Sequence, residues 1–335
     1  KDTGLNINPW PKLVDHYTAT QRLNLAQAFN PIGSLTGMFV ASTYILNKLQ
    51  VEEFRAAEKA AHPEYNELLP AVVDGKLTSA LQGFSLSNPI EHQAMQAADL
   101  LTVRGPYVAI AIVVSLLFVL FLFSKLPNTI SHEHPLTRKE LCQTLRRLMQ
   151  NKRYIEGVVA QAFYVGAQIM CWTFIIHYGM TVVGLTASEA QSYNIIAMGI
   201  FLVNRFVCTF ILSYIKPGKM LMLLALGAMI FTTGAIFMDG MFGLYSLIGV
   251  SACMSLMFPT IYGIALKDMG DDASLASAGL VMAIVGGALM PPLQGFLIDR
   301  NPLISTLTSV QTSFFMPLIC FVAIAIFGYR AHKIY

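Results

Sequence analysis

Long apolar runs, separated by short polar segments, fill most of this chain. A helix needs about 20 mostly apolar residues to cross a bilayer. Eight runs are long enough, over residues 23–47, 107–124, 155–179, 191–215, 220–238, 241–266, 274–298 and 303–328. Backbone polar groups find no water in the hydrocarbon core, so runs of this length must be helical. The pattern predicts an all-α, polytopic membrane protein with eight transmembrane helices.

Positive charge in the connections predicts how these helices are oriented. The segment 125–154 is a basic linker that contains Lys125, Arg138, Lys139, Arg146, Arg147, Lys152 and Arg153. Loops rich in Lys and Arg stay on the cytoplasmic side, so we expect the linker and the C-terminus to be cytoplasmic. Within 132–153, Leu141, Leu145 and Leu148 repeat at helical spacing and predict an amphipathic surface helix.

The predicted helices are distributed unevenly around the linker, two before it and six after it. We expect a partial N-terminal bundle over 1–124, whose two helices are separated by a long external loop at 48–105. A six-helix bundle over 155–335 should follow the linker. Repeated helical bundles around a site at the bilayer midplane are typical of secondary transporters. The first half would then be incomplete, which agrees with a truncated sequence without proving one.

Composition excludes several classes of function. Hydrophobic residues make up 55% of the 335 residues and charged residues 12%, against about 25% charged in soluble domains. This excludes a disordered chain, a nucleic-acid binder and an ordinary cytosolic enzyme. The net charge of +3 is too small to suggest a polyanionic partner.

No enzyme, cofactor or metal motif occurs in the sequence. Metalloprotease, nucleophile-elbow, phosphate-loop and dinucleotide motifs are all absent. The cysteines have no paired spacing, so we expect neither a disulfide framework nor a zinc site. His132 and His134 are close together in the polar linker, and we interpret them as an incidental pair. We therefore expect neither an enzyme nor a bound cofactor.

Uncharged polar residues interrupt two of the apolar runs at helical spacing. One set is Asn24, Gln27 and Asn30, and the other is Gln161, Tyr164, Gln168 and Trp172. The members of the second set fall within about 80° of one another around a helix. Amides exchange hydrogen bonds with hydroxyls, and an aromatic face can cover the apolar side of a sugar ring. We favour a cavity that these residues line and that binds a sugar. The alternative is that the amides bridge neighbouring helices.

Charge inside the predicted spans is scarce. Arg205 is the one basic residue deep within a run, and an intramembrane charge is a functional-site hypothesis by default. It could face the cavity, or it could pair with an acidic residue or a helix C-terminus, and both alternatives stay open. Apart from Glu156 near one edge, the spans hold no carboxylate. Either the protein is not coupled to protons, or its relay lies elsewhere.

Small residues recur every four positions in one of the last spans. Gly287, Pro291, Gly295 and Asp299 form this ladder. Small residues at this spacing let helix backbones approach closely, and proline weakens a helix locally. The ladder therefore predicts a packing face and a bend rather than a binding site.

Four segments of the chain resemble one family of transporters. They are RLNLAQAFNPIG (22–33), AQAFYVGAQIMCW (160–172), FPTIYGIALKDMG (258–270) and GGALMPPLQGFLID (286–299). They resemble the L-fucose:proton symporters of the major facilitator superfamily, within its fucose–galactose–glucose branch. The resemblance runs in order from the family's fifth helix to its twelfth. NPW at 8–10 resembles the end of the fourth helix.

The resemblance implies roles for individual residues. Gln27 and Asn30 match the sugar-facing amide pair of the fifth helix. Phe201 matches an aromatic cavity residue of the eighth helix, and Arg205 matches an arginine of that helix. Phe258 stands where the fucose transporter has a tyrosine. This difference removes one hydroxyl and leaves the sugar preference open. The proton-linked aspartate and glutamate of the family belong to its first and fourth helices and have no counterpart here.

Together these observations predict a secondary transporter for proton-coupled uptake of L-fucose or a related hexose. Its partners would be the sugar, protons and the lipid bilayer, and not nucleic acid. We expect a monomer in the cytoplasmic (inner) membrane of a bacterium. The expected sugar-binding residues are Gln27, Asn30, Gln161, Gln168, Phe201 and Phe258. The expected structural or gating residues are Arg205, Gly295 and Asp299.

Three rival interpretations remain open. The first is a carrier of galactose, glucose or another small solute, such as a drug or an organic anion. The second is a membrane receptor that binds sugar without moving it. The third is an inactive fragment. A drug or anion carrier should have a more apolar or more basic cavity than the amide-rich stripes suggest.

Overall fold

The computed structural model describes residues 27, 30–45, 48–68, 70–124, 138–212, 214–300 and 306–334. These residues are helical apart from short connections, and no strand occurs among them. They divide into two compact units. The larger comprises Lys1–Leu35 and Leu141–Tyr335, and the smaller comprises Thr36–Glu140. Each unit is described separately.

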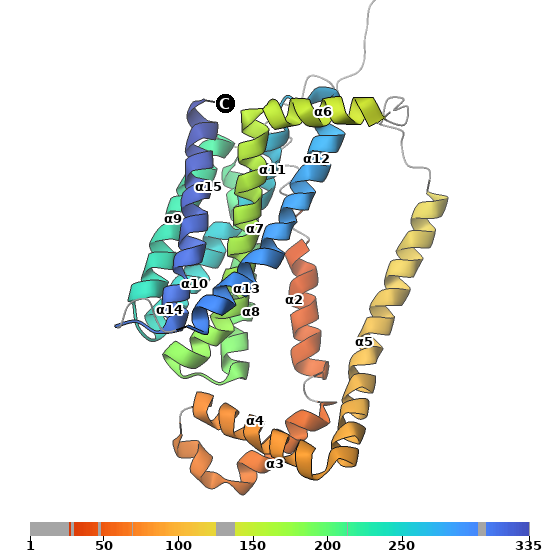
Figure 1. Cartoon of the computed structure of the whole chain (residues 1–335), viewed down its shortest axis with the longest axis vertical. Helices are drawn as coiled ribbons and strands as arrows, with labels where there is room; N and C mark the ends of the chain where they lie inside the picture. Colours follow the sequence, from red (N-terminus) through yellow and green to blue (C-terminus); the bar gives the residue numbers. More distant parts are fainter. Residues whose placement is uncertain are drawn as a thin grey trace, which may run out of the picture. The chain divides into compact units, whose positions relative to one another are not determined.

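The larger unit contains the helices that follow the linker (Figure 1). They are α7 (Lys152–Tyr178), α8 (Ala187–Ile211), α9 (Pro217–Phe237), α10 (Met241–Met254), α11 (Met257–Leu266), α12 (Ala273–Met282), α13 (Gly286–Ile298), α14 (Ser309–Ser313) and α15 (Phe315–Lys333). Short turns of other helix types complete this part, at η4 (Gly179–Val183), η5 (Gly270–Asp272) and η6 (Ala283–Val285). Among the described residues, six membrane-length apolar segments follow the linker, as predicted.

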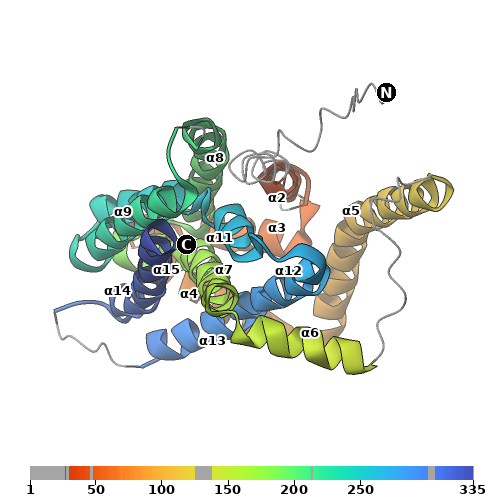
Figure 2. The ribbon, with the colours of Figure 1, turned by 90° about the horizontal axis from the view of Figure 1, so that it is seen from above.

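Helix α7 lies at the centre of this bundle. It packs against α8, α10, α11, α13 and α15, and Figure 2 shows it between α11, α12 and α15. Its buried side chains include Tyr164, Met170, Cys171, Ile175 and Tyr178. A helix that is apolar around most of its circumference is suited to a position surrounded by other helices. The polar positions of α7 are therefore also enclosed.

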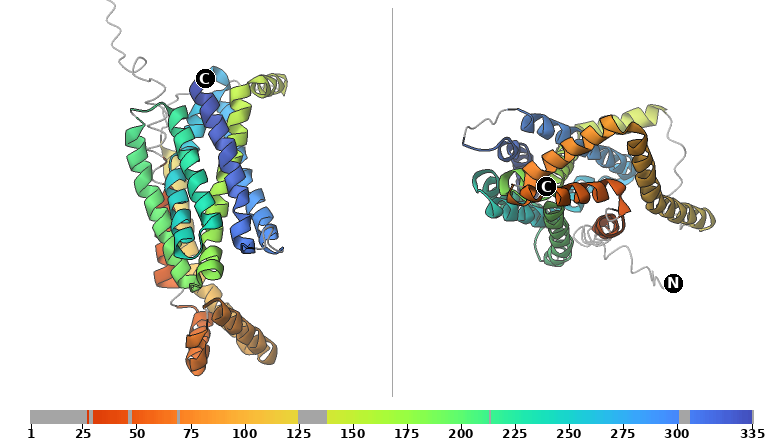
Figure 3. Two further views of the ribbon diagram at one scale, coloured as in Figure 1. Left: turned by 90° about the vertical axis from the view of Figure 1, so that its left-hand side faces the viewer. Right: turned by 90° about the horizontal axis from the view of Figure 1, so that it is seen from below.

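Glycines allow the neighbouring helices to approach closely. Helices α9, α10 and α15 run side by side (Figure 3, left). A Cβ atom at Gly328 of α15 would come within 2.8 Å of the Met222 nitrogen of α9. The predicted ladder lies on α13, where a Cβ at Gly287 would come within 2.9 Å of Val165 in α7. One at Gly295 would lie 3.8 Å from the Phe174 ring.

The end of the ladder is not part of this packing. Asp299 is the C-cap of α13, where its N–H donates to the carbonyl of Gly295 over 3.0 Å. Its side chain is exposed. The close approach to α7 is therefore made at Gly287 and not at Asp299.

The smaller unit contains α3 (Gln50–Ala61), η3 (Pro63–Glu67), α4 (Pro70–Ser87) and α5 (Pro89–Phe123). The segment 48–105, expected as a loop, is thus largely helical. Its α3 is rich in Ala and Glu, which favour helices without needing a buried face. The carboxylate of Asp99 in α5 accepts hydrogen bonds from the N–H groups of Gln50 (2.6 Å) and Val51 (3.2 Å). It thereby satisfies the open N-terminus of α3.

The two spans before the linker differ in how far the structure describes them. Helix α5 is a membrane-length apolar helix, and it begins well before the expected 107. The run at 23–47 is described as Gln27, α2 (Asn30–Val40) and η1 (Ala41–Ile45). Asn24 lies outside the described residues. The structure therefore assigns seven membrane-length helices among the described residues, against the eight runs in the sequence.

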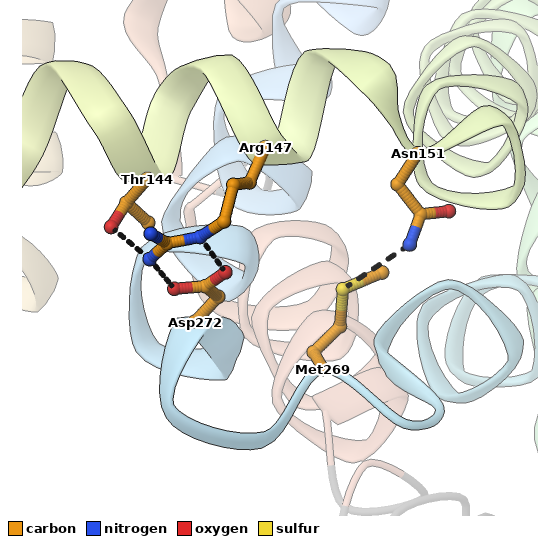
Figure 4. Close-up of polar contacts among 5 residues, drawn as sticks. All are labelled: Thr144, Arg147, Asn151, Met269 and Asp272. Carbon is orange, nitrogen blue, oxygen red and sulfur yellow. Dashed lines mark hydrogen bonds and ion pairs between the residues drawn. The ribbon is translucent and has the colours of Figure 1, made fainter.

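The predicted surface helix is confirmed as α6 (Arg138–Gln150), which lies across the ends of α7 and α12 (Figure 1). Thr144 and Leu148 are its buried residues. The Arg147 guanidinium donates to both carboxylate oxygens of Asp272, at 3.0 and 2.7 Å (Figure 4). This bond lowers the pKa of the Asp272 carboxyl and raises that of Arg147.

Further contacts hold the turn between α11 and α12. The Asn151 amide lies 3.9 Å from the Met269 sulfur (Figure 4). Arg153 pairs with Asp268 at 3.2 Å and also donates to the carbonyl of Lys267. Asp268 adopts a left-handed conformation with φ of 63°, which is uncommon for a residue with a side chain. The start of α7 therefore fixes a turn that carries local strain.

Candidate functional site

A break in one membrane segment organises the polar residues of the bundle. Helix α10 ends at Met254 and α11 begins at Met257, so the segment is interrupted at Ser255 and Leu256. Pro259 follows the break. Proline has no N–H group and cannot bond the carbonyl four residues earlier, which is the carbonyl of Ser255. The break therefore leaves main-chain oxygens in the bundle that need other donors.

Side chains from α7 and α8 donate hydrogen bonds to the carbonyls around this break. The Tyr164 hydroxyl donates to the carbonyl of Met254 over 3.0 Å. The Asn204 amide donates to the carbonyl of Ala252 over 2.7 Å. Arg205 Nε donates to the carbonyl of Ser255, also over 2.7 Å. The polar residues of the two helices thus stabilise the interruption in the third.

Arg205 makes a second contact of the same kind. Its Nη1 donates to the main-chain carbonyl of Gln27 over 2.7 Å, and Pro31 stands four residues after Gln27. The guanidinium also lies over the Phe201 ring, 5.0 Å from its centre. Arg205 is only 3% exposed, and no ion pair to a carboxylate is recorded for it within the described residues. Carbonyl dipoles and an aromatic face therefore surround its charge.

Aromatic side chains extend this group of residues. The rings of Trp172 and Phe201 meet edge to face, with centres 5.0 Å apart. The indole N–H of Trp172 donates to the Ser251 hydroxyl over 3.3 Å. Tyr164 meets Phe258 edge to face at 6.1 Å. We name the set the Arg205 cluster, and its members are Tyr164, Trp172, Phe201, Asn204, Arg205, Ser251, Ser255 and Phe258.

The predicted amides occupy different environments. Gln161 is fully buried, and neither its Nε2 nor its Oε1 finds a hydrogen-bond partner among the described residues. Gln168 is half-buried on the same helix. The contact of Gln27 with Arg205 is made by its main chain, and its side chain is half-buried. The side chain of Asn30 lies outside what the structure describes, although its backbone begins α2.

Sequence reasoning did not single out Asn204, Ser251 or Ser255 as site residues. Ser251 acts through its hydroxyl and Asn204 through its amide, whereas Ser255 accepts hydrogen bonds at both its carbonyl and its hydroxyl. Pro259 was the available signal, because a proline within an apolar run marks a weakened helix and a free carbonyl. Which side chain binds the free Ser255 carbonyl depends on a neighbouring helix. The local sequence therefore does not reveal the contact with Arg205.

The chemistry of the Arg205 cluster suits binding rather than catalysis. Its polar groups are amides, hydroxyls and one arginine, which can exchange hydrogen bonds with a neutral polyol. No group of three His, Cys, Asp or Glu residues that could hold a metal is present in the described part of the chain. His132 and His134 lie outside the described residues. Glu156, near one end of α7, pairs with Arg330 at 2.8 Å.

Comparison with known proteins identifies the family. The chain is 46% identical over 321 residues to the L-fucose-proton symporter of Haemophilus influenzae, which covers 96% of this chain and 69% of that protein. The chain belongs to the L-fucose-proton symporter family. The resemblance inferred from the four sequence segments is confirmed. The relatives are transporters and not enzymes.

Other relatives lie in the same branch. Identity to the L-fucose-proton symporter of Escherichia coli is 30% over 309 residues, covering 92% of this chain and 63% of that protein. Identity to the glucose/galactose transporter of Brucella abortus is 27%, covering 94% of this chain and 64% of the relative. The chain therefore spans about two thirds of the length of these relatives. No protein-family model matches it.

Solved structures show the same fold. The chain matches a major facilitator superfamily transporter, FucP, in the outward conformation, with a TM-score of 0.69 and 28% identity. The match covers 94% of this chain and 69% of that one. A second structure, of the Escherichia coli fucose:proton symporter, gives a TM-score of 0.70 at 27% identity, covering 95% and 70%. The helices described above therefore have the fold of a major facilitator transporter.

Proposed function

We propose that the protein takes up L-fucose, or a closely related hexose, together with protons by alternating access. The names of its relatives, which are L-fucose-proton symporters, support this substrate class. One observation on the chain itself carries the proposal furthest. Gln161 is fully buried with both amide atoms unpartnered among the described residues. A buried amide without a partner needs an explanation, and a sugar hydroxyl would supply both a donor and an acceptor.

The proposed site combines two polar stripes. Gln27 and Asn30 lie in the first predicted span, and their side chains would bind hydroxyl groups of the sugar. Gln161 and Gln168 would face them from α7, where the next residues of the same stripe, Tyr164 and Trp172, belong to the Arg205 cluster. Phe201 and Phe258 would cover the apolar side of the sugar ring. Because the proposed binding residues come from different spans, the site would lie at the bilayer midplane, as in other transporters with repeated halves.

The identity of the sugar depends on few groups. Phe258 is half-buried and lies between Tyr164 and Tyr262, with ring centres 6.1 and 6.5 Å away. A phenylalanine offers no hydroxyl where the resemblance expects a tyrosine. Galactose or glucose is therefore the second candidate, and the Brucella abortus relative, named a glucose/galactose transporter, favours it. Competition of fucose binding by galactose and glucose distinguishes the two.

The proposed setting is the cytoplasmic membrane of a bacterium. The basic residues of α6 and of the start of α7 support a cytoplasmic position for that end of the bundle. The C-terminus, with Arg330 and Lys333 in the last turn of α15, would lie on the same side. We propose that the protein is a monomer. No residue of this chain is assigned to proton coupling.

A binding measurement tests the proposed site. Gln27→Ala removes the amide but keeps the main-chain carbonyl that Arg205 binds. We expect the Kd for L-fucose, measured by isothermal titration calorimetry, to rise about tenfold, as the loss of one or two hydrogen bonds would cause. The amount of protein inserted in the membrane should not change. An unchanged Kd would contradict the role of Gln27.

A second experiment separates transport from folding. Arg205→Ala should reduce the rate of fucose uptake far more than the amount of protein in the membrane. Equal losses of uptake and of protein would indicate that Arg205 serves folding alone. The measurement compares initial uptake rates with quantitative detection of the protein in the same membranes.

A further inference from the structure

The two main-chain oxygens that Arg205 binds share one feature. Each stands four residues before a proline: Gln27 before Pro31 and Ser255 before Pro259. In a regular helix the N–H of the later residue would bond the earlier carbonyl. Proline cannot provide that N–H. Neither carbonyl can therefore accept the hydrogen bond that a regular helix would supply from the residue four positions later.

Arginine is suited to satisfy two such acceptors at once. The planar guanidinium presents its N–H groups in a rigid fork. Nε is used for Ser255 and Nη1 for Gln27, each over 2.7 Å. Arg205 is buried, and Pro31 and Pro259 are buried as well. Breaking either bond would leave a carbonyl without a donor in a region that excludes water.

We propose that Arg205 is a positioning residue that pins the main chain of Gln27 to that of Ser255, at two carbonyls that each stand four residues before a proline. This role rests on the proposed sugar site, because one pinned residue is Gln27, whose side chain is expected to bind the sugar. By holding the main chain of Gln27, Arg205 fixes where that amide stands relative to the break between α10 and α11. Arg205 acts on the sugar through Gln27 and not by direct contact.

Variants at Arg205 test whether the forked N–H groups of the guanidinium are needed. Arg205→Lys keeps the charge but replaces the fork with a compact ammonium group, and Arg205→Gln removes the charge. If both carbonyls must be held, the two variants should raise the Kd for L-fucose alike, by about tenfold. A Kd near the wild-type value for Arg205→Lys, with a large loss for Arg205→Gln, would overturn the pin and indicate a role for the charge alone.

Variants at the prolines test the same bond from the other side. Pro31→Ala restores an N–H that can take the Gln27 carbonyl along the helix axis, away from Arg205. We expect this substitution to raise the Kd at least threefold. The double variant with Arg205→Gln should bind no more weakly than Arg205→Gln alone, because each change removes the same bond between Arg205 and the Gln27 carbonyl. Full additivity in this cycle would overturn the pin.

The matched control is Pro106→Ala in α5, which belongs to the other compact unit. It makes the same chemical change in a membrane-length helix outside the Arg205 cluster, and its Kd should equal that of the wild type. Melting temperatures of all variants should be recorded with the binding data. A threefold change in Kd for Pro106→Ala would show that proline replacement acts nonspecifically and would overturn the inference.

A measurement without sugar separates this inference from the proposed function. Hydrogen–deuterium exchange over residues 30–40 should become at least threefold faster in Arg205→Lys and Arg205→Gln, and not in Pro106→Ala. If the wild type binds no fucose but exchange still accelerates, the proposed function fails and the pin stands. If the wild type binds fucose and exchange is unchanged in both Arg205 variants, the pin fails and the function stands.

Discussion

The rings of Trp172 and Phe201 meet edge to face with their centres 5.0 Å apart. One ring comes from the polar stripe of α7, and the other comes from α8, four residues before Arg205. The contact therefore joins the two helices that donate hydrogen bonds to the break between α10 and α11. It links the aromatic part of the Arg205 cluster to its polar part.

Replacing Trp172 should weaken sugar binding more than it weakens folding. Trp172→Leu removes the ring contact with Phe201 and the hydrogen bond to Ser251, but it keeps an apolar side chain. We expect the Kd for L-fucose to rise by up to about thirtyfold in calorimetry, since loss of an aromatic contact costs about 1 kcal/mol and loss of the hydrogen bond about as much again. Phe237→Leu is the control and should bind normally, because Phe237 is exposed on α9 and its ring meets Phe315 of α15 outside the Arg205 cluster.

Gln161→Met should separate stability from binding. Because the amide is buried without a partner among the described residues, replacing it with an apolar side chain of similar size removes a desolvation cost of about 1–3 kcal/mol. The melting temperature in detergent should therefore stay equal or rise, while the Kd for fucose increases. A fall in melting temperature with unchanged affinity would indicate that Gln161 bridges helices instead.

Two glycines of the ladder on α13 should differ in how well they tolerate replacement by alanine. Gly287→Ala places a Cβ 2.9 Å from Val165 and 3.1 Å from Ile169, so α13 and α7 must shift apart. Overpacking of this kind costs about 1–3 kcal/mol, and the melting temperature should fall. Gly295→Ala meets its nearest atom, on Phe174, at 3.8 Å and should be neutral. Equal melting temperatures for the two variants would contradict the close packing at Gly287.

The bond between Arg147 and Asp272 should make stability depend on pH. The bond lowers the pKa of Asp272 in the folded protein, so its stabilising effect is present above the unfolded carboxyl pKa of about 3.9. It is lost as the pH falls through the folded pKa. The melting temperature of Asp272→Asn should lie below that of the wild type at pH 7. The difference should disappear in acid, whereas a constant difference from pH 7 to pH 3 would contradict this pairing.

Much of the fold could be predicted from the sequence, because the bilayer imposes simple rules. Six apolar runs after the linker became six membrane-length segments, and the leucine spacing in 132–153 became α6. The helical structure of 48–105 was not predicted. Its first helix, α3, is short and mostly polar, and Asp99 stabilises it from another helix, 48 and 49 residues away. Such a contact is not visible in a local pattern.

The candidate site could be predicted only in part. Residue type and helical spacing identified Gln27, Asn30, Gln161, Gln168 and Arg205, and the resemblance added Phe201 and Phe258. The partners of Arg205 could not be predicted, because they are main-chain carbonyls and have no residue identity in the sequence. The two prolines that free these carbonyls were visible, but their shared partner depends on how three segments fold together.

The central claim is coupled sugar uptake, and one transport measurement tests it most directly. The protein is reconstituted in liposomes, an inward proton gradient is imposed, and the internal concentration of radiolabelled L-fucose is followed. The account predicts saturable accumulation above the external concentration, lost when a protonophore collapses the gradient. Saturable binding without accumulation, or uptake that ignores the gradient, would contradict it.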